Sequence, residues 1–166
     1  GIAYGLMAPT SPDNDKFETM WHYMQGGPGI FKGDLFFYKF DGNIGNEIKK
    51  IDNPRPDKFT YYWQNYYFGE TVAINNNYCM IGWPRDQTNG YSSGSVSIYK
   101  YDDVLDDWIY NTVLYKENPS RYDYFPSCLL LDENNKLFAG AKYGKFGTIK
   151  SGSMNIFQAN VLDIWG

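Results

Sequence analysis

The sequence is poor in the residues that build most catalytic and metal centres. Its 166 residues include one histidine, His22, and two cysteines, Cys79 and Cys128, far apart in the chain. A zinc cluster of Cys and His ligands needs more of them at closer spacing. The sequence also lacks a phosphate-binding Gly-rich loop, a His-Glu-x-x-His motif and a Gly-x-Ser-x-Gly elbow. We therefore predict that the chain is not an enzyme, that it has no catalytic residues, and that His22 is a surface or packing residue.

An excess of positive charge and a long hydrophobic run are also missing. Fifteen Lys and Arg stand against 19 Asp and Glu, for a formal net charge of −4. Such a chain has no overall field that attracts phosphate backbones, so nucleic acid is not an expected partner. The longest apolar run, residues 128–131, is far shorter than the roughly 18 residues of a membrane-spanning helix, so membrane insertion is not expected.

The two cysteines each fall inside a stretch that predicts a β-strand, Cys79 within residues 78–84 and Cys128 within residues 125–131. Buried free thiols are the favoured interpretation, because cysteine is among the most buried residue types. A disulfide between strands of neighbouring sheets is the alternative, so the redox state stays open.

Aromatic residues and glycine are abundant. The chain has 16 Tyr, 11 Phe, 5 Trp and 17 Gly. A chain this aromatic can offset the entropy of ordering by burial, which excludes intrinsic disorder. A helix bundle would be built on Leu, Ala, Glu and Lys instead. The composition therefore predicts an all-β fold with many turns.

A Gly-led strand pattern occurs three times. Residues 33–40 read GDLFFYKF, residues 94–101 read GSVSIYKY and residues 152–159 read GSMNIFQA, at spacings of 61 and 58 residues. Each copy has a glycine, a small polar residue and then alternating side chains, as in a strand that leaves a tight bend. Three copies at nearly constant spacing indicate a repeat architecture.

Three further strand patterns recur around the Gly-led strand. An apolar run precedes it, at residues 4–9, 78–84 and 136–142, and a loop follows that run, at residues 10–32, 85–93 and 143–151. An earlier strand, at residues 68–74 and 125–131, is followed by an Asn- or Asp-rich turn. A later, weaker strand is expected at residues 47–51, 108–115 and 161–165. Asn and Asp tolerate the conformations of tight turns, which supports hairpins.

Four antiparallel strands in roughly sixty residues are typical of a β-propeller blade. The middle copy resembles an FG-GAP repeat, the blade type of integrin α-chain heads: Phe68-Gly69 stands for the family's Phe-Gly, residues 82–84 (GWP) for its Gly-Ala-Pro, and residues 94–99 for its Gly-x-Val strand. The third copy departs from the family at residues 125–126 (FP) and 140–142 (GAK). We expect an incomplete first blade at 1–60 that lacks its first strand, a second blade at 61–120 and a third at 121–166.

About three blades are fewer than the four to eight of a closed propeller. An unclosed set would leave sheet faces and edges bare. The missing blades are expected from a longer parent chain, which the start at Gly1 favours, or from copies of this chain.

Aromatic residues in or beside the expected loops are the candidate binding residues, because rigid rings suit both sugar stacking and protein interfaces. They are Trp21, Tyr23, Trp83 and Tyr91. The alternative for each is packing inside a blade.

No cofactor or metal is expected. Some FG-GAP propellers bind Ca²⁺ through a carboxylate-rich loop, but the corresponding turns at residues 75–77 (NNN) and 132–135 (DENN) are too short for such a site. Two other acidic groups are interpreted as solvated turns: Asp13 and Asp15 with Glu18, and the four aspartates at 102, 103, 106 and 107.

The sequence thus predicts a non-enzymatic structural or adhesive module of a larger extracellular, cell-surface or virion assembly. A carbohydrate-binding, lectin-like propeller is the first alternative. A fragment of a propeller-fold hydrolase is the second, because the spacing of carboxylates in three dimensions is not readable from sequence.

Overall fold

The computed structural model describes residues 3–7, 17–25, 31–40, 45–52, 67–146, 149–160 and 164–166. The described residues form thirteen β-strands and no α-helix, and all paired strands are antiparallel. The expectation of an all-β fold is confirmed. In this part of the chain, no helix is long and apolar enough to cross a membrane.

Two sheets have four strands each, in chain order. The first sheet contains β1 (Ala3–Met7), β2 (Phe17–Gln25), β3 (Phe31–Phe40) and β4 (Gly45–Asp52). The second sheet contains β5 (Thr71–Ile74), β6 (Tyr78–Trp83), β7 (Ser95–Asp102) and β8 (Asp107–Leu114).

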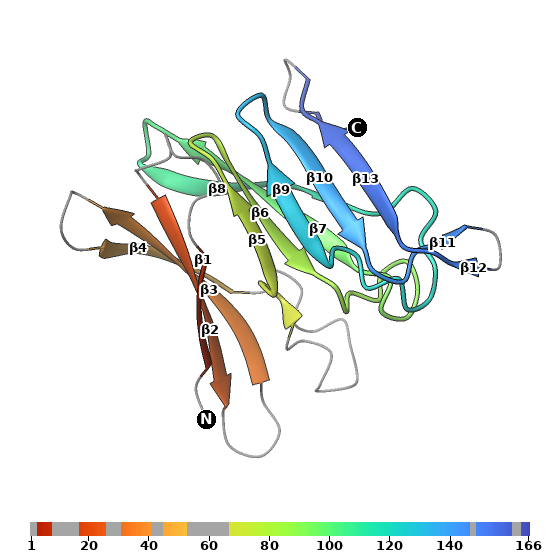
Figure 1. The fold of residues 1–166 in the computed structure, drawn as a ribbon. Coiled ribbons are helices and arrows are strands. Elements are labelled where there is room, and N and C mark those ends of the chain that lie inside the picture. Colours follow the sequence, from red (N-terminus) through yellow and green to blue (C-terminus); the bar gives the residue numbers. More distant parts are fainter. Residues whose placement is uncertain are drawn as a thin grey trace.

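The third sheet has three strands in the order β13-β10-β9. They are β9 (Cys128–Leu131), β10 (Lys136–Ala141) and β13 (Ser153–Gln158), and a small hairpin of β11 (Lys145–Phe146) and β12 (Ile149–Lys150) interrupts them. The expected fourth strand at 161–165 lies partly outside the described residues. Near its end, Trp165 forms an isolated bridge with Ala159, the residue that follows β13. Figure 1 shows the three sheets following one another across the molecule in chain order.

The first sheet differs from the sequence prediction in the number and order of its strands. Residues 10–32 were expected to form a loop, but residues 17–25 within them form β2. Strand β1 therefore takes the first position of its sheet rather than the second, and this sheet has four strands instead of three. Strand β3 also begins two residues before Gly33, at Phe31.

A glycine directly precedes β7 in the second sheet and β13 in the third sheet, because the backbone there is left-handed. Gly94 has φ +86° and Gly152 has φ +74°. A side chain at Gly94 would also collide with the carbonyl of Phe125, which pairs with Gly94 across the two sheets. Only glycine adopts this conformation without a steric cost, which explains the repeated Gly.

The turn after the first strand uses the same chemistry in both sheets. The Asn75 Oδ1 accepts hydrogen bonds from the backbone N–H of Asn77 (2.9 Å) and Tyr78 (2.8 Å). The Asp132 Oδ1 accepts from Asn134 (2.9 Å) and Lys136 (2.7 Å). These side chains replace backbone partners in a tight turn, as expected of Asn and Asp.

Two apolar cores separate the three sheets. The core between the first and second sheets contains side chains from both, chiefly Leu35, Phe37, Ile51, Phe68, Val72, Ile74, Cys79, Ile81, Trp83, Tyr99 and Trp108. The core between the second and third sheets includes Ala73, Tyr78, Met80, Val96, Ile98, Leu114, Phe125, Leu131, Leu137, Ala139, Ala141 and Trp165. Each face of the second sheet therefore packs against a neighbouring sheet.

The two cysteines differ. Both are free thiols; Cys79 is buried between the first and second sheets, whereas Cys128 is exposed. The expectation of two buried thiols is wrong for Cys128. It begins β9 on the side of the third sheet that no described sheet covers.

Candidate functional site

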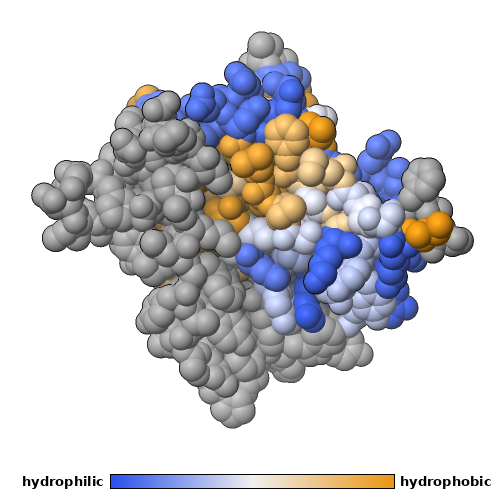
Figure 2. Space-filling view, in the orientation of Figure 1, coloured by the Kyte–Doolittle hydropathy of each residue, from blue (hydrophilic) through white to orange (hydrophobic). Residues whose placement is uncertain are grey.

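The uncovered side of the third sheet is apolar. Strand pairing places Cys128 and Leu130 of β9, Phe138 of β10, and Met154 and Ile156 of β13 on one side, which we call the outer face. Leu130, Met154 and Ile156 are 49%, 66% and 57% exposed. Figure 2 shows hydrophobic residues gathered over these strands. Contiguous exposed apolar patches on soluble proteins mark interaction surfaces.

The outer face corresponds, position by position, to a buried face of the second sheet. Aligning the repeats on their Gly-led strands matches Met154 with Val96 and Ile156 with Ile98. Val96 and Ile98 are fully buried under the third sheet. The same kind of surface is therefore covered once and bare once within one chain.

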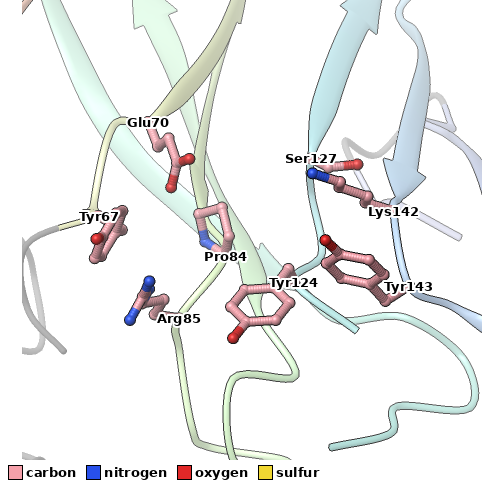
Figure 3. A pocket seen from close by; sticks show the side chains of 8 residues that line it. All are labelled: Tyr67, Glu70, Pro84, Arg85, Tyr124, Ser127, Lys142 and Tyr143. Atoms are coloured by element: carbon pink, nitrogen blue, oxygen red, sulfur yellow. The ribbon is translucent and has the colours of Figure 1, made fainter. Parts of the chain in front are cut away.

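A pocket of about 370 Å³ lies where the second and third sheets meet at one end. Figure 3 shows its walls, with one group of side chains beside the second sheet and another beside the third. The lining residues are Tyr67, Glu70, Pro84, Arg85, Tyr124, Ser127, Lys142 and Tyr143.

The pocket is built from the same four positions of two successive repeats. Phe68 and Phe125 are equivalent, so Tyr67 corresponds to Tyr124 and Glu70 to Ser127. Pro84 and Arg85 follow β6 as Lys142 and Tyr143 follow β10. These positions share one end of the sheets because the first strand begins where its antiparallel second strand finishes.

Cations lie over the tyrosine rings in this pocket. The Arg85 guanidinium carbon is 4.0 Å from the ring centre of Tyr67 and 5.7 Å from that of Tyr124. The Lys142 Nζ is 5.1 Å from the ring centre of Tyr143, which meets Tyr124 edge to face at 5.7 Å. Cation–π contacts of this kind orient both the rings and the charges.

Aromatic side chains continue beyond the pocket and, with the pocket tyrosines and their neighbouring cations, form what we call the aromatic surface. Tyr122 stacks on Tyr124 at 6.2 Å and meets Tyr91 edge to face at 5.1 Å. The Arg121 guanidinium lies 4.9 Å from the ring centre of Tyr122 and 5.1 Å from that of Tyr91. Tyrosines and cations therefore alternate along this end of the second and third sheets.

Glu70 is the acidic residue of the pocket wall. Partial burial raises the pKa of its carboxyl group, and the positive charge of Arg85 lowers it in part. The net result is a pKa above the ordinary value of a glutamate.

A buried ion pair orders the segment that carries Arg121, Tyr122 and Tyr124. The Lys116 Nζ lies 3.0 Å from the Asp123 Oδ2, with Asp123 fully buried. The same carboxylate oxygen accepts a hydrogen bond from the Ser120 N–H at 2.7 Å. This segment is the connection between the second and third sheets, so one ion pair supports both the fold and the pocket wall.

The four aromatic residues that the sequence analysis proposed as binding residues lie in different environments. Trp83 is fully buried against Phe68, so its ring is not available to a ligand. Tyr91 is partly exposed and belongs to the aromatic surface. Trp21 and Tyr23, like His22, lie in β2 instead of a loop, and their side chains are outside the described residues.

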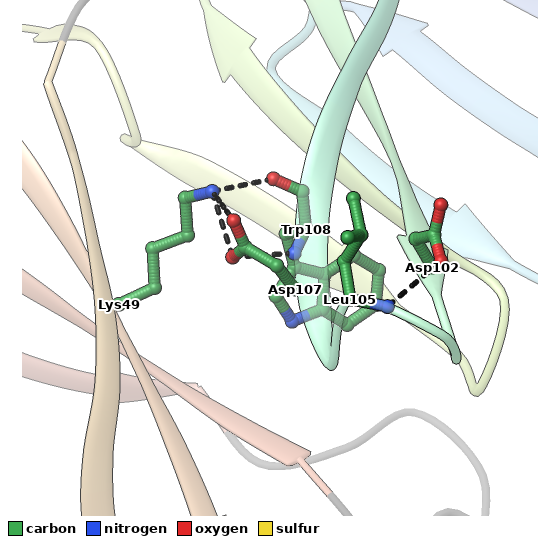
Figure 4. A network of polar contacts seen from close by, with 5 residues as sticks. All are labelled: Lys49, Asp102, Leu105, Asp107 and Trp108. Carbon is green, nitrogen blue, oxygen red and sulfur yellow. Dashed lines mark hydrogen bonds and ion pairs between the residues drawn. The ribbon is translucent and has the colours of Figure 1, made fainter.

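Two carboxylates of the acidic hairpin between β7 and β8, those of Asp102 and Asp107, bind other groups of the protein (Figure 4). The Lys49 Nζ lies 2.7 Å from both carboxylate oxygens of Asp107, which links the first sheet to the second. The Asp102 Oδ1 accepts hydrogen bonds from the backbone N–H of Val104 (2.9 Å) and Leu105 (3.1 Å). Among the described residues, no three His, Cys, Asp or Glu side chains are grouped to hold a metal ion. Residues 13–15 lie outside that part of the chain.

Comparison with protein-family models and with curated proteins finds no match for this sequence.

Proposed function

We propose that the chain is a non-enzymatic interaction module, that its sheets are successive blades of a β-propeller, and that the outer face of the third sheet packs against one further sheet of the same kind. The FG-GAP resemblance suggests the same role, as a structural or adhesive part of a larger assembly. The carrying observation is that the outer face repeats, at equivalent positions, a face that is buried in the second sheet.

The partner follows from the order of the sheets. The second sheet is covered on both faces, and the third is covered on the face toward the second. In a solution of this chain alone, the candidate is the first sheet of a second copy, because no described sheet packs against the face that it turns away from the second sheet. We therefore take that sheet as the occupant of the outer face.

Sedimentation velocity of the isolated chain tests this proposal. We expect association that grows with concentration, because burying an apolar sheet face is favourable. Ile156→Lys places a charge on the outer face and should leave the chain monomeric. Val104→Lys is the matched control, since Val104 is 93% exposed on the β7–β8 hairpin, away from this face.

A wild-type chain that stays monomeric at high concentration contradicts the proposal. So does association that Ile156→Lys and Val104→Lys leave equally unchanged. Thermal unfolding of each variant shows whether it is folded, which the exposure of both side chains leads us to expect.

A further inference from the structure

The pocket between the second and third sheets has no part in the proposed packing of sheets. Its wall holds three tyrosine rings, the cations Arg85 and Lys142, the carboxylate of Glu70 and the hydroxyl of Ser127. A concave site with aromatic walls and a few converging polar groups is the usual form of a small-molecule site. Its volume, about 370 Å³, suits a ligand of about one sugar ring.

The charge around the pocket is opposite to that of the chain. The chain carries a net −4, yet the aromatic surface brings together Arg85, Arg121 and Lys142, with the Lys150 Nζ 5.7 Å from the ring centre of Tyr143. Glu70 is the one exposed carboxylate in the pocket wall. The site therefore favours an anionic ligand.

Two neighbouring acids are buried and do not line the pocket. Asp123 is buried and paired with Lys116, 3.0 Å away. Asp86 is buried, and its Oδ1 accepts hydrogen bonds from the N–H and hydroxyl of Thr88 at 2.8 and 2.7 Å. Among the described residues, no carboxylate forms an ion pair with Lys142.

Glu70 and Ser127 distinguish between anionic ligands. A carboxylate in the wall accepts hydrogen bonds from hydroxyl groups, whereas the ionised side chains of an acidic peptide are acceptors only and offer it no donor. A sugar ring supplies hydroxyl donors for Glu70 and also an apolar C–H face for a tyrosine ring. The combination of cations, one acceptor carboxylate and tyrosine rings matches a sugar that carries its own acid group.

We propose that this pocket binds an acidic sugar, a ring that bears a carboxylate. The ligand's carboxylate forms ion pairs with Arg85 and Lys142. Its ring face packs on Tyr124 or Tyr143. Its hydroxyl groups form hydrogen bonds with Glu70 and Ser127. A guanidinium has five N–H donors, so attraction to Glu70 leaves capacity for a second anionic group.

The test uses two sugars that differ in one group. Methyl glucuronide has a carboxylate where methyl glucoside has a hydroxymethyl group, and each is titrated into isotopically labelled protein while NMR shifts are followed. We expect glucuronide to bind roughly tenfold tighter than glucoside, because hydrogen bonds to charged groups are the stronger ones. Acetate should bind more weakly than glucuronide, because it has no ring.

Matched variants locate the binding. Lys142→Ala and Tyr143→Ala, both at exposed positions of the pocket, should each weaken glucuronide binding severalfold. Lys100→Ala and Tyr110→Ala change equally exposed residues of the second sheet, outside the pocket, and should have no effect.

Three results would overturn the proposal: equal binding of glucoside and glucuronide, glucuronide binding that the two pocket variants leave unchanged, or binding of an acidic tetrapeptide but not of glucuronide. The titration is repeated in Ile156→Lys, where the outer face is blocked. Sugar binding there is independent of association, so failure of this inference and failure of the packing proposal are separable.

Discussion

Strands β7 and β13 hold the same place in the second and third sheets, and their surroundings differ. In β7, the first five residues, 95–99, are all buried. In β13, burial alternates between partly buried and exposed residues along the whole strand. The second sheet packs on both sides, whereas the third packs on one.

The sequences of the two strands do not account for this difference. Val96 and Ile98 in β7 correspond to Met154 and Ile156 in β13, and all four are apolar. In repeat proteins, a terminal unit usually has a polar outer face that keeps the protein soluble. The third sheet has no such polar face, so it resembles an internal unit of a stack.

The largest effect is expected where the second and third sheets are joined. Asp123→Ala leaves the buried Lys116 without its carboxylate, and should lower the free energy of unfolding by about 3–5 kcal/mol. Urea denaturation measures this change. The double variant Lys116→Met, Asp123→Leu should recover much of the loss, because it removes both charges. A loss below about 1 kcal/mol in Asp123→Ala would show that the ion pair does not hold this connection.

Alanine substitutions of the equivalent residues Ile98 and Ile156 compare how much the covered face and the outer face contribute to the free energy of unfolding. Ile98→Ala opens a cavity between two sheets and should cost about 2–5 kcal/mol. Ile156→Ala changes a side chain that is 57% exposed and should alter the unfolding free energy of dilute protein by about 0.5 kcal/mol or less. Similar losses at both positions would mean that the outer face is covered even in dilute solution.

The two repeat glycines give a smaller contrast. Gly152→Ala meets the cost of a left-handed backbone, about 1–2 kcal/mol, with its nearest neighbouring atom 3.5 Å away. Gly94→Ala has the same backbone cost and a collision with the Phe125 carbonyl as well. Thermal unfolding should therefore rank Gly94→Ala as the more destabilised. The opposite ranking would mean that the connection adjusts freely at Gly94.

Thiol labelling requires no substitution, and it compares Cys79, which lies between the first and second sheets, with Cys128 on the outer face. Burial raises the pKa of Cys79 well above its ordinary value, so little reactive thiolate forms there near neutral pH. Cys128 is exposed on the outer face. One thiol per chain should react in native protein and two in denaturant, and association through the outer face should slow the reaction of Cys128. Rapid reaction of both thiols in native protein would contradict this.

Strands with a regular pattern were predictable from the sequence. Alternating apolar residues and a leading glycine located β7 and β13, and short apolar runs located β6 and β10. Strand β2 was missed because residues 20–24 (MWHYM) show no alternation. The 23-residue loop assigned to 10–32 was itself a sign of a missed element, since structureless loops of that length are uncommon.

The pocket was not predictable in the same way. Arg85 and Tyr143 are far apart in the sequence and come together because the ends of two sheets meet. One signal was available: aligning the repeats matches Tyr67 with Tyr124, just before the Phe of each unit. Trp83 was misjudged because the sequence shows where a strand ends, but not which side of its last residue a neighbouring sheet covers. The exposure of Cys128 has the same cause.

The hydrogen bonds of Asn75 give the stacking of sheets a direction. Its side-chain amide donates to the Asp132 carbonyl at 3.1 Å and to the Asn135 Oδ1 at 2.9 Å, from the turn of one sheet to the turn of the next. A contact that runs from one unit to its successor is heterologous: the two surfaces that meet are different. Copies joined in this way close into a ring or grow into a filament, depending on the rotation between them. Two copies of three sheets would place six sheets around one axis, within the four to eight of closed propellers.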